Sequence, residues 1–231
     1  MNQRLCLFFA GYYAYNPALY YNQRQLIHEF SLTGEQKAQD VASRLNGDLA
    51  ESHFEPESNI RAAMSIAREF QIPDLNEPKD FTGYFDWREQ YTGKFEQLFP
   101  MSRIDHYYFL FARKLSEVYC NIGFAEKLLK LRAEIPPEVN LDRKIGKCLK
   151  DSEYIFFKLI AAAALLSSEP RQSCFNQHYR RLLKEYEQFK GVEIPAQPND
   201  SSGLQASLKA FSQEVETGIK ECAGVLKELG V

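Results

Sequence analysis

The residues best suited to acid–base or metal chemistry are four histidines and five cysteines. His28, His53 and His106 each lie one or two residues from a carboxylate, and side chains at those spacings point in different directions on a helix. A di-iron helical bundle would need Glu-x-x-His pairs, which the sequence lacks. The cysteines are scattered, with no CxxC and no histidine at metal-ligand spacing. We therefore expect no metal and no cofactor, and we expect these three histidines at the surface or half-buried.

Arg171 and His178 are separated by six residues at the start of a predicted helix. This pair resembles the Arg-x(4–6)-His motif of the HEPN family, which comprises small helical RNases. The resemblance implies a dimer in which the arginine and histidine of both protomers converge on the phosphodiester. It covers only this pair, and Gln172 stands where asparagine is frequent in the family. An HEPN-like RNase using Arg171 and His178 is one alternative function.

A tyrosine cluster near the N-terminus is the main functional lead. Tyr12, Tyr13, Tyr15, Tyr20 and Tyr21 lie within ten residues, too many to share one buried face. Tyrosine is favoured at protein interfaces because it offers a large, stiff contact area with a polar tip. The cluster predicts a surface that binds another protein; the alternative is a group at the core edge with its hydroxyls in water.

Apolar periodicity predicts helices that must position these residues. Between residues 102 and 231 the sequence favours four long helices, with apolar residues alternating four and three apart, which is typical of antiparallel helix packing. The stretch Tyr154–Ser168 is apolar on nearly every side apart from Lys158, and so predicts an enclosed helix at the centre of the bundle, with Lys158 reaching the edge. The expected closure is an up-down helical bundle.

The first 101 residues are less regular. Shorter helices are expected to pack against the C-terminal bundle, and we interpret the first 15 residues as helix although their short apolar run fits a strand as well. Residues 71–85 contain two prolines and a glycine without a period and predict a long loop. The N-terminal region 1–101 and the bundle 102–231 are expected to form one compact unit.

Composition excludes several classes of protein. The chain is 45% hydrophobic and 26% charged, with a net charge of -3, which does not indicate a nucleic-acid or membrane partner. No stretch approaches the ~20 apolar residues of a membrane span. The scattered cysteines are typical of buried thiols in a reducing compartment, so a cytoplasmic protein is expected.

These patterns predict an all-α fold: four long C-terminal helices in an up-down bundle, with additional N-terminal helices packed on it. The common nucleotide-binding and acyl-transfer motifs, GxGxxG, the P-loop and GxSxG, are absent. We therefore expect a non-catalytic protein-interaction module, an adaptor, regulator or effector subunit, that recognises another protein or a second copy of itself. Besides the RNase, the remaining alternative is a bundle that binds an apolar small molecule among its aromatic side chains.

Overall fold

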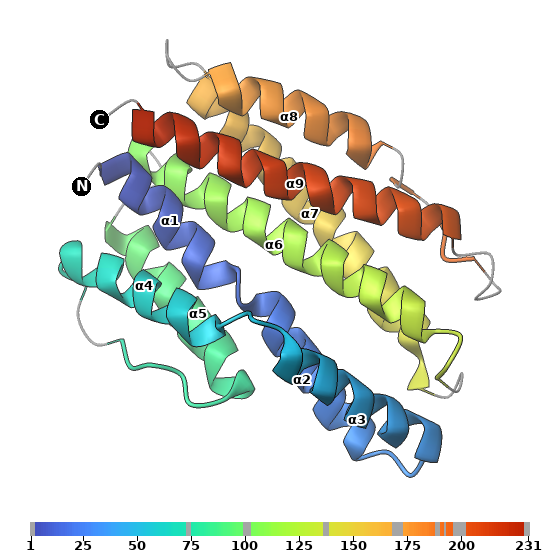
Figure 1. Cartoon of the computed structure of the whole chain (residues 1–231). Coiled ribbons are helices and arrows are strands. Elements are labelled where there is room, and N and C mark those ends of the chain that lie inside the picture. Colours follow the sequence, from blue (N-terminus) through green and yellow to red (C-terminus); the bar gives the residue numbers. More distant parts are fainter. Residues whose placement is uncertain are drawn as a thin grey trace.

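The computed structural model describes residues 3–72, 75–98, 103–135, 139–167, 173–187, 190–191, 193–195 and 202–228. Within these ranges the chain is built from α-helices and contains no strand (Figure 1), which confirms the all-α prediction. No helix among them is both long and apolar enough to cross a membrane. The helices are α1 Gln3–Tyr15, α2 Ala18–Ser31, α3 Gln36–Glu51, α4 Pro56–Glu69, α5 Phe81–Leu98, α6 Ile104–Leu131, α7 Leu141–Ser167, α8 Ser173–Tyr186 and α9 Ser202–Glu228.

Helix α6 is the centre of the molecule. It packs most extensively against α7 and α1, and also against α9 and α2. The apolar stripe predicted for this helix is confirmed, since Tyr108, Phe111, Leu115 and Val118 are fully buried along it. In the C-terminal part, α6 contacts α7, α7 contacts α8, α8 contacts α9, and α9 returns to α6.

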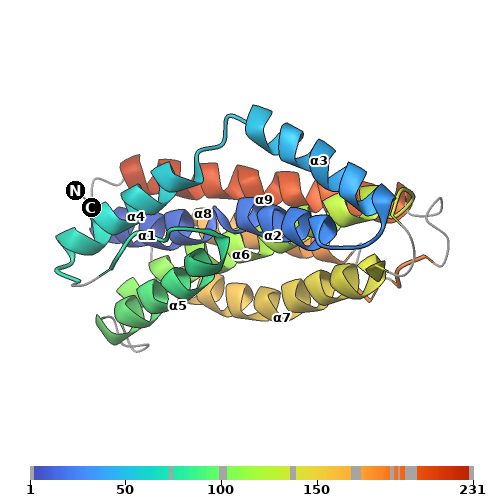
Figure 2. The ribbon, with the colours of Figure 1, turned by 90° about the horizontal axis from the view of Figure 1, so that it is seen from below.

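The prediction that Tyr154–Ser168 is the enclosed central helix is wrong. Residues 154–167 form the second half of α7, which lies on the outer side of α6 (Figure 2), whereas Ser168 lies outside the described residues. Tyr154 is 63% exposed and Leu165 is 42% exposed. Periodicity could not show this, because an apolar run reads alike whether its outer face is covered or bare. The expectation for Lys158 is confirmed: the side chain is exposed and its ammonium lies 4.8 Å from the centroid of the Tyr154 ring.

Helix α1 confirms the helical interpretation of the first residues and is a core element. Leu7, Phe8 and Ala14 are fully buried, and the helix contacts α4, α5, α6 and α9. Gly11 allows the close approach to α6, because a Cβ atom at this position would lie 2.4 Å from the carbonyl oxygen of Phe109. The first helix therefore belongs to the same packed interior as the C-terminal helices.

The loop predicted over residues 71–85 is shorter than expected. Helix α5 begins at Phe81, because the Asp80 carboxylate accepts a hydrogen bond of 2.7 Å from the Gly83 amide and caps the helix. Tyr84, in the first turn of this helix, is fully buried. Its ring stacks on that of Tyr21, with the ring centroids 4.3 Å apart.

Helices α2 and α3 form a hairpin at the opposite end of the molecule from the chain termini (Figure 1). Helix α2 contacts α3, α5 and α6, whereas α3 packs mainly against α2. In Figure 2, α3 stands away from the body of the molecule. Side chains of α2, α3 and α6 line a depression between the hairpin and α6.

Candidate functional site

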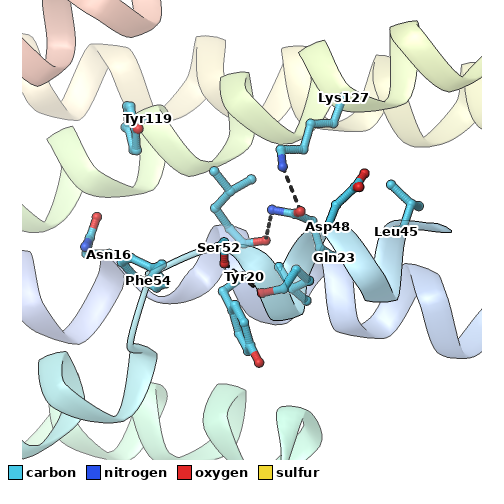
Figure 3. A pocket seen from close by; sticks show the side chains of 11 residues that line it. Asn16, Tyr20, Gln23, Leu45, Asp48, Ser52, Phe54, Tyr119 and Lys127 are labelled. Atoms are coloured by element: carbon cyan, nitrogen blue, oxygen red, sulfur yellow. Dashed lines mark hydrogen bonds between the residues drawn. The ribbon is translucent and has the colours of Figure 1, made fainter. Parts of the chain in front are cut away.

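A groove lies where α2, α3 and α6 meet, and we call it the α2–α3–α6 groove (Figure 3). Its volume is about 280 Å³. Most of the surface that lines it is apolar, and it is open to solvent along the loop between α3 and α4, where Phe54 is 37% exposed. The lining residues are Asn16, Leu19, Tyr20, Gln23, Leu45, Asp48, Leu49, Ser52, Phe54, Tyr119 and Lys127.

The apolar wall of the groove follows from the helical repeat of α3. Leu45 and Leu49 continue the stripe of Val41 toward the end of this helix, so they face α2 and α6. The helix ends at Glu51, and the hydroxyl of the next residue, Ser52, donates a hydrogen bond of 2.7 Å to the Leu49 carbonyl. The following loop brings the Phe54 ring to 6.2 Å from the ring of Tyr20, measured between centroids.

The rim of the groove is polar and carries both signs of charge. The Lys127 ammonium donates a hydrogen bond of 2.8 Å to the Gln23 side-chain oxygen, and the Gln23 amide nitrogen donates one of 3.2 Å to the Leu19 carbonyl (Figure 3). Burial lowers the pKa of Lys127, and the neighbouring charge of Lys130 adds to this effect. The exposed Asp48 carboxylate supplies negative charge on the α3 side.

Two of the five tyrosines predicted to bind a partner lie at or beside this groove. Tyr20 is half-buried and lines it. Tyr12 on α1 is also half-buried, and burial raises its pKa to about 12, with smaller electrostatic contributions from Cys120 and the groove residue Tyr119. The tyrosine side chains along this side of the molecule therefore come from α1, α2 and α6.

The other three predicted tyrosines serve packing. Tyr13 is half-buried and stacks on Phe9 at a centroid separation of 5.2 Å. Tyr21 is buried in its stack with Tyr84. Tyr15 is buried, and its hydroxyl is hydrogen-bonded to that of Thr92 at 2.9 Å. The cluster thus divides between the core and its edge, and none of the five tyrosines is fully exposed.

His178 is the described member of the Arg171–His178 pair, and Arg171 lies outside the described residues. The His178 ring is fully buried between α8 and α9, with Nδ1 3.6 Å from a carboxylate oxygen of Glu214. It fits over Gly218, where a Cβ atom would lie 1.5 Å from the ring. Burial lowers the pKa of His178 to about 4, helped by the charge of Arg181. The RNase alternative stays a prediction.

The expected placement of histidines is wrong for His106. His28 and His53 are exposed, whereas His106 is as fully buried as His178, because each of these two sits on the inward face of a helix packed on both sides. Among the described residues, no group of three or more histidine, cysteine, aspartate or glutamate side chains could hold a metal ion.

Comparisons of the chain with protein-family models, with curated proteins and with solved structures give no match.

Sequence reasoning missed most of the groove. Leu45, Leu49 and Tyr119 appear in the sequence as ordinary members of helical stripes, and nothing in their spacing shows that three helices diverge beside them. Phe54 was the one available signal, because a large aromatic residue in a short loop between two helices has no helix face on which to be buried.

Proposed function

We propose that the protein is a non-catalytic interaction module that binds a segment of another protein in the α2–α3–α6 groove. The observation that carries this proposal is the open apolar lining of the groove, with Phe54 partly exposed at its edge and Tyr20 beneath it. Aromatic side chains that are already ordered lose little entropy on binding, so they are effective anchors for a partner.

The shape of the groove favours an apolar helix or extended segment over an enclosed small molecule. The groove is open to solvent along the loop between α3 and α4, whereas small-molecule sites bury most of their ligand. One or two apolar side chains of a partner would fill it, while the rest of the segment lies along α3. Lys127 and Asp48 at the rim would orient the segment through opposite charges.

The test is selection of peptides from a displayed random library against the intact chain. We expect the selected peptides to share apolar residues at helical spacing, and we expect Phe54→Ala to weaken their binding by about tenfold or more, because loss of a buried aromatic anchor costs 1–2 kcal/mol or more. Leu32→Ala is the matched control, since Leu32 is a 73% exposed apolar residue at the end of α2 and does not line the groove.

The alternatives are separate outcomes of the same experiment. If the peptides bind Phe54→Ala and wild type equally well, the groove is not the docking site and the proposal fails. Saturable binding of an apolar dye with no peptide selected would favour the apolar small-molecule alternative. Concentration-dependent dimerisation lost in Phe54→Ala would identify the partner as a second copy of the chain.

A further inference from the structure

A second and different cavity lies on the other side of α2, where α2, α5, α6 and α7 surround a polar cleft of about 380 Å³. Unlike the α2–α3–α6 groove, more of its surface is polar than apolar. Its polar lining residues include Asn22, Arg88, Lys114, Glu117, Lys147 and Asp151. Nothing in the proposed protein interaction uses these residues.

The charged pair Lys114 and Glu117 stands in the middle of the most buried helix. Lys114 is only 5% exposed, and its ammonium lies 2.6 Å from a carboxylate oxygen of Glu117. Burial lowers the pKa of Lys114, although the carboxylate of Glu117 opposes that shift. Withdrawing such charges from water is costly, and well-packed apolar residues of similar volume would often be as stable or more stable. Their presence at the cleft is therefore a sign of function rather than of packing.

Arg88 is held in place by aromatic rings before any ligand arrives. Its guanidinium carbon lies 4.7 Å from the centroid of Tyr15, 5.2 Å from that of Phe85 and 5.9 Å from that of Tyr84. Its buried Nε atom has no hydrogen-bond acceptor among the described residues. A guanidinium fixed in this way is well suited to bind an anion, because it presents planar donors at little cost in side-chain entropy.

The charges that line the cleft do not cancel. Arg88, Lys114 and Lys147 carry three positive charges, whereas Glu117 and Asp151 carry two negative ones. Partial burial limits screening by solvent, so the excess positive charge attracts an anion more strongly than it would on an open surface. Phe85 and Ile155 add an apolar wall beside the cations.

We propose that the cleft binds a small organic anion, with its carboxylate or phosphate group facing Arg88 and Lys114 and its apolar part lying against Phe85 and Ile155. The amides of Asn22 and Asn121 in the same lining offer further hydrogen bonds to such a ligand. The cavity volume suits a compact molecule of the size of a substituted benzene ring.

Isothermal titration calorimetry of the full chain with phenyl phosphate tests the proposal. Benzoate, inorganic phosphate and phenol are the other probes. We expect saturable binding of phenyl phosphate or benzoate, and the tighter of the two identifies the anionic group. Inorganic phosphate and phenol, which each carry half of the recognised features, should bind at least about tenfold more weakly. Raising the salt concentration should weaken the binding of the anionic probes, because salt screens the positive charges of the cleft.

Two substitutions locate the binding at the cleft. Lys147→Gln removes an exposed lining charge and should weaken the anion several-fold, whereas Lys150→Gln removes the same charge one turn along α7, outside the cleft, and should change little. Lys114→Met should abolish the binding, and its thermal unfolding shows whether the variant is folded. The proposal is overturned if none of the probes binds saturably. It is also overturned if Lys147→Gln and Lys150→Gln weaken the binding equally.

Discussion

At the scale of single residues, the structure separates side chains that hold the fold from those available to a partner. Tyr15 illustrates the first group. The guanidinium carbons of Arg88 and Arg113 lie 4.7 Å and 5.2 Å from the centroid of its ring, and its hydroxyl is hydrogen-bonded to that of Thr92. The Thr92 hydroxyl itself donates to the Arg88 carbonyl, so the Tyr15 hydroxyl is the donor to Thr92. Phe54 and Tyr20 represent the second group.

His178 should make the protein less stable in acid. Its pKa is lowered to about 4 in the folded state, against ~6.5 in the unfolded chain. The unfolded state therefore binds the proton more readily, so stability is full above pH ~6.5 and falls as the pH drops toward 4, by up to about 3 kcal/mol. Denaturant unfolding of wild type and His178→Gln at pH 7 and pH 4 measures this difference.

Glu214 and Arg181 lie beside His178, so their charges must be considered when the two proteins are compared. Glu214 lies 3.6 Å from the His178 ring, and burial raises the pKa of its carboxyl, so its titration changes stability with the opposite sign. Arg181 forms ion pairs with both Glu214 and Glu221, and its guanidinium stays positively charged at every pH in question. Because His178→Gln lacks the titrating imidazole, we expect it to lose less stability between pH 7 and pH 4 than wild type. Equal losses would show that His178 does not titrate as described.

At the scale of helices, the contact between α1 and α6 leaves no room for a side chain at Gly11. A Cβ atom on Gly11 would lie 2.4 Å from the Phe109 carbonyl oxygen and 2.9 Å from the Arg113 amide nitrogen, and neither backbone atom can move alone. We expect Gly11→Ala to destabilise the protein by about 1–3 kcal/mol or more, because overpacking forces the two helices apart. Chemical denaturation of the variant measures the loss.

Gly47→Ala is the matched control for this substitution. Gly47 lies within α3, and a Cβ atom there meets nothing within 4 Å. Alanine is the better helix former, so this variant should be as stable as wild type or more stable by up to about 1 kcal/mol. If both variants lose stability equally, the close approach of α1 to α6 does not limit the fold.

The helices were the part of the structure that the sequence predicted best. The buried stripes of α6 and α9 follow from a regular four-and-three spacing that needs no knowledge of neighbouring helices. The relative placement of helices could not be read in this way. The apolar face of α7 at Tyr154 and Leu165 is exposed, and α1 lies in the core, because long-range packing decides which apolar stripe is covered.

At the scale of the whole molecule, the interior is shared between the N-terminal and C-terminal helices. Phe8 of α1 lies 6.5 Å from Phe111 of α6, measured between ring centroids, and Phe95 of α5 stacks on Phe109 at 5.0 Å. The groove and the polar cleft both form where α2 meets α6, so both sites combine side chains from the two halves of the chain. Apart from Phe54, no local pattern in the sequence points to either site, because each is assembled from helices far apart along the chain.

A fragment of residues 102–231 should therefore not fold like the intact chain. Without α1 and α5, the face of Phe111 that packs on Phe8 and the face of Phe109 that stacks on Phe95 would be open to water, which costs about 25 cal/mol for each Å² of apolar surface. We expect the fragment to aggregate or to unfold without a cooperative transition, whereas the intact chain unfolds in one transition. Circular dichroism during thermal unfolding checks this. Cooperative unfolding of the fragment at the temperature of the intact chain would show that the C-terminal helices are an independent domain.

Photo-crosslinking shows whether the α2–α3–α6 groove binds a partner protein, as we propose. A photoreactive phenylalanine analogue would replace Phe54 in one variant and the exposed Leu32 in another, with both proteins produced in the cells from which the chain comes. We expect one discrete protein adduct from position 54 and none from position 32. No adduct at position 54, or the same adducts from both positions, would contradict it.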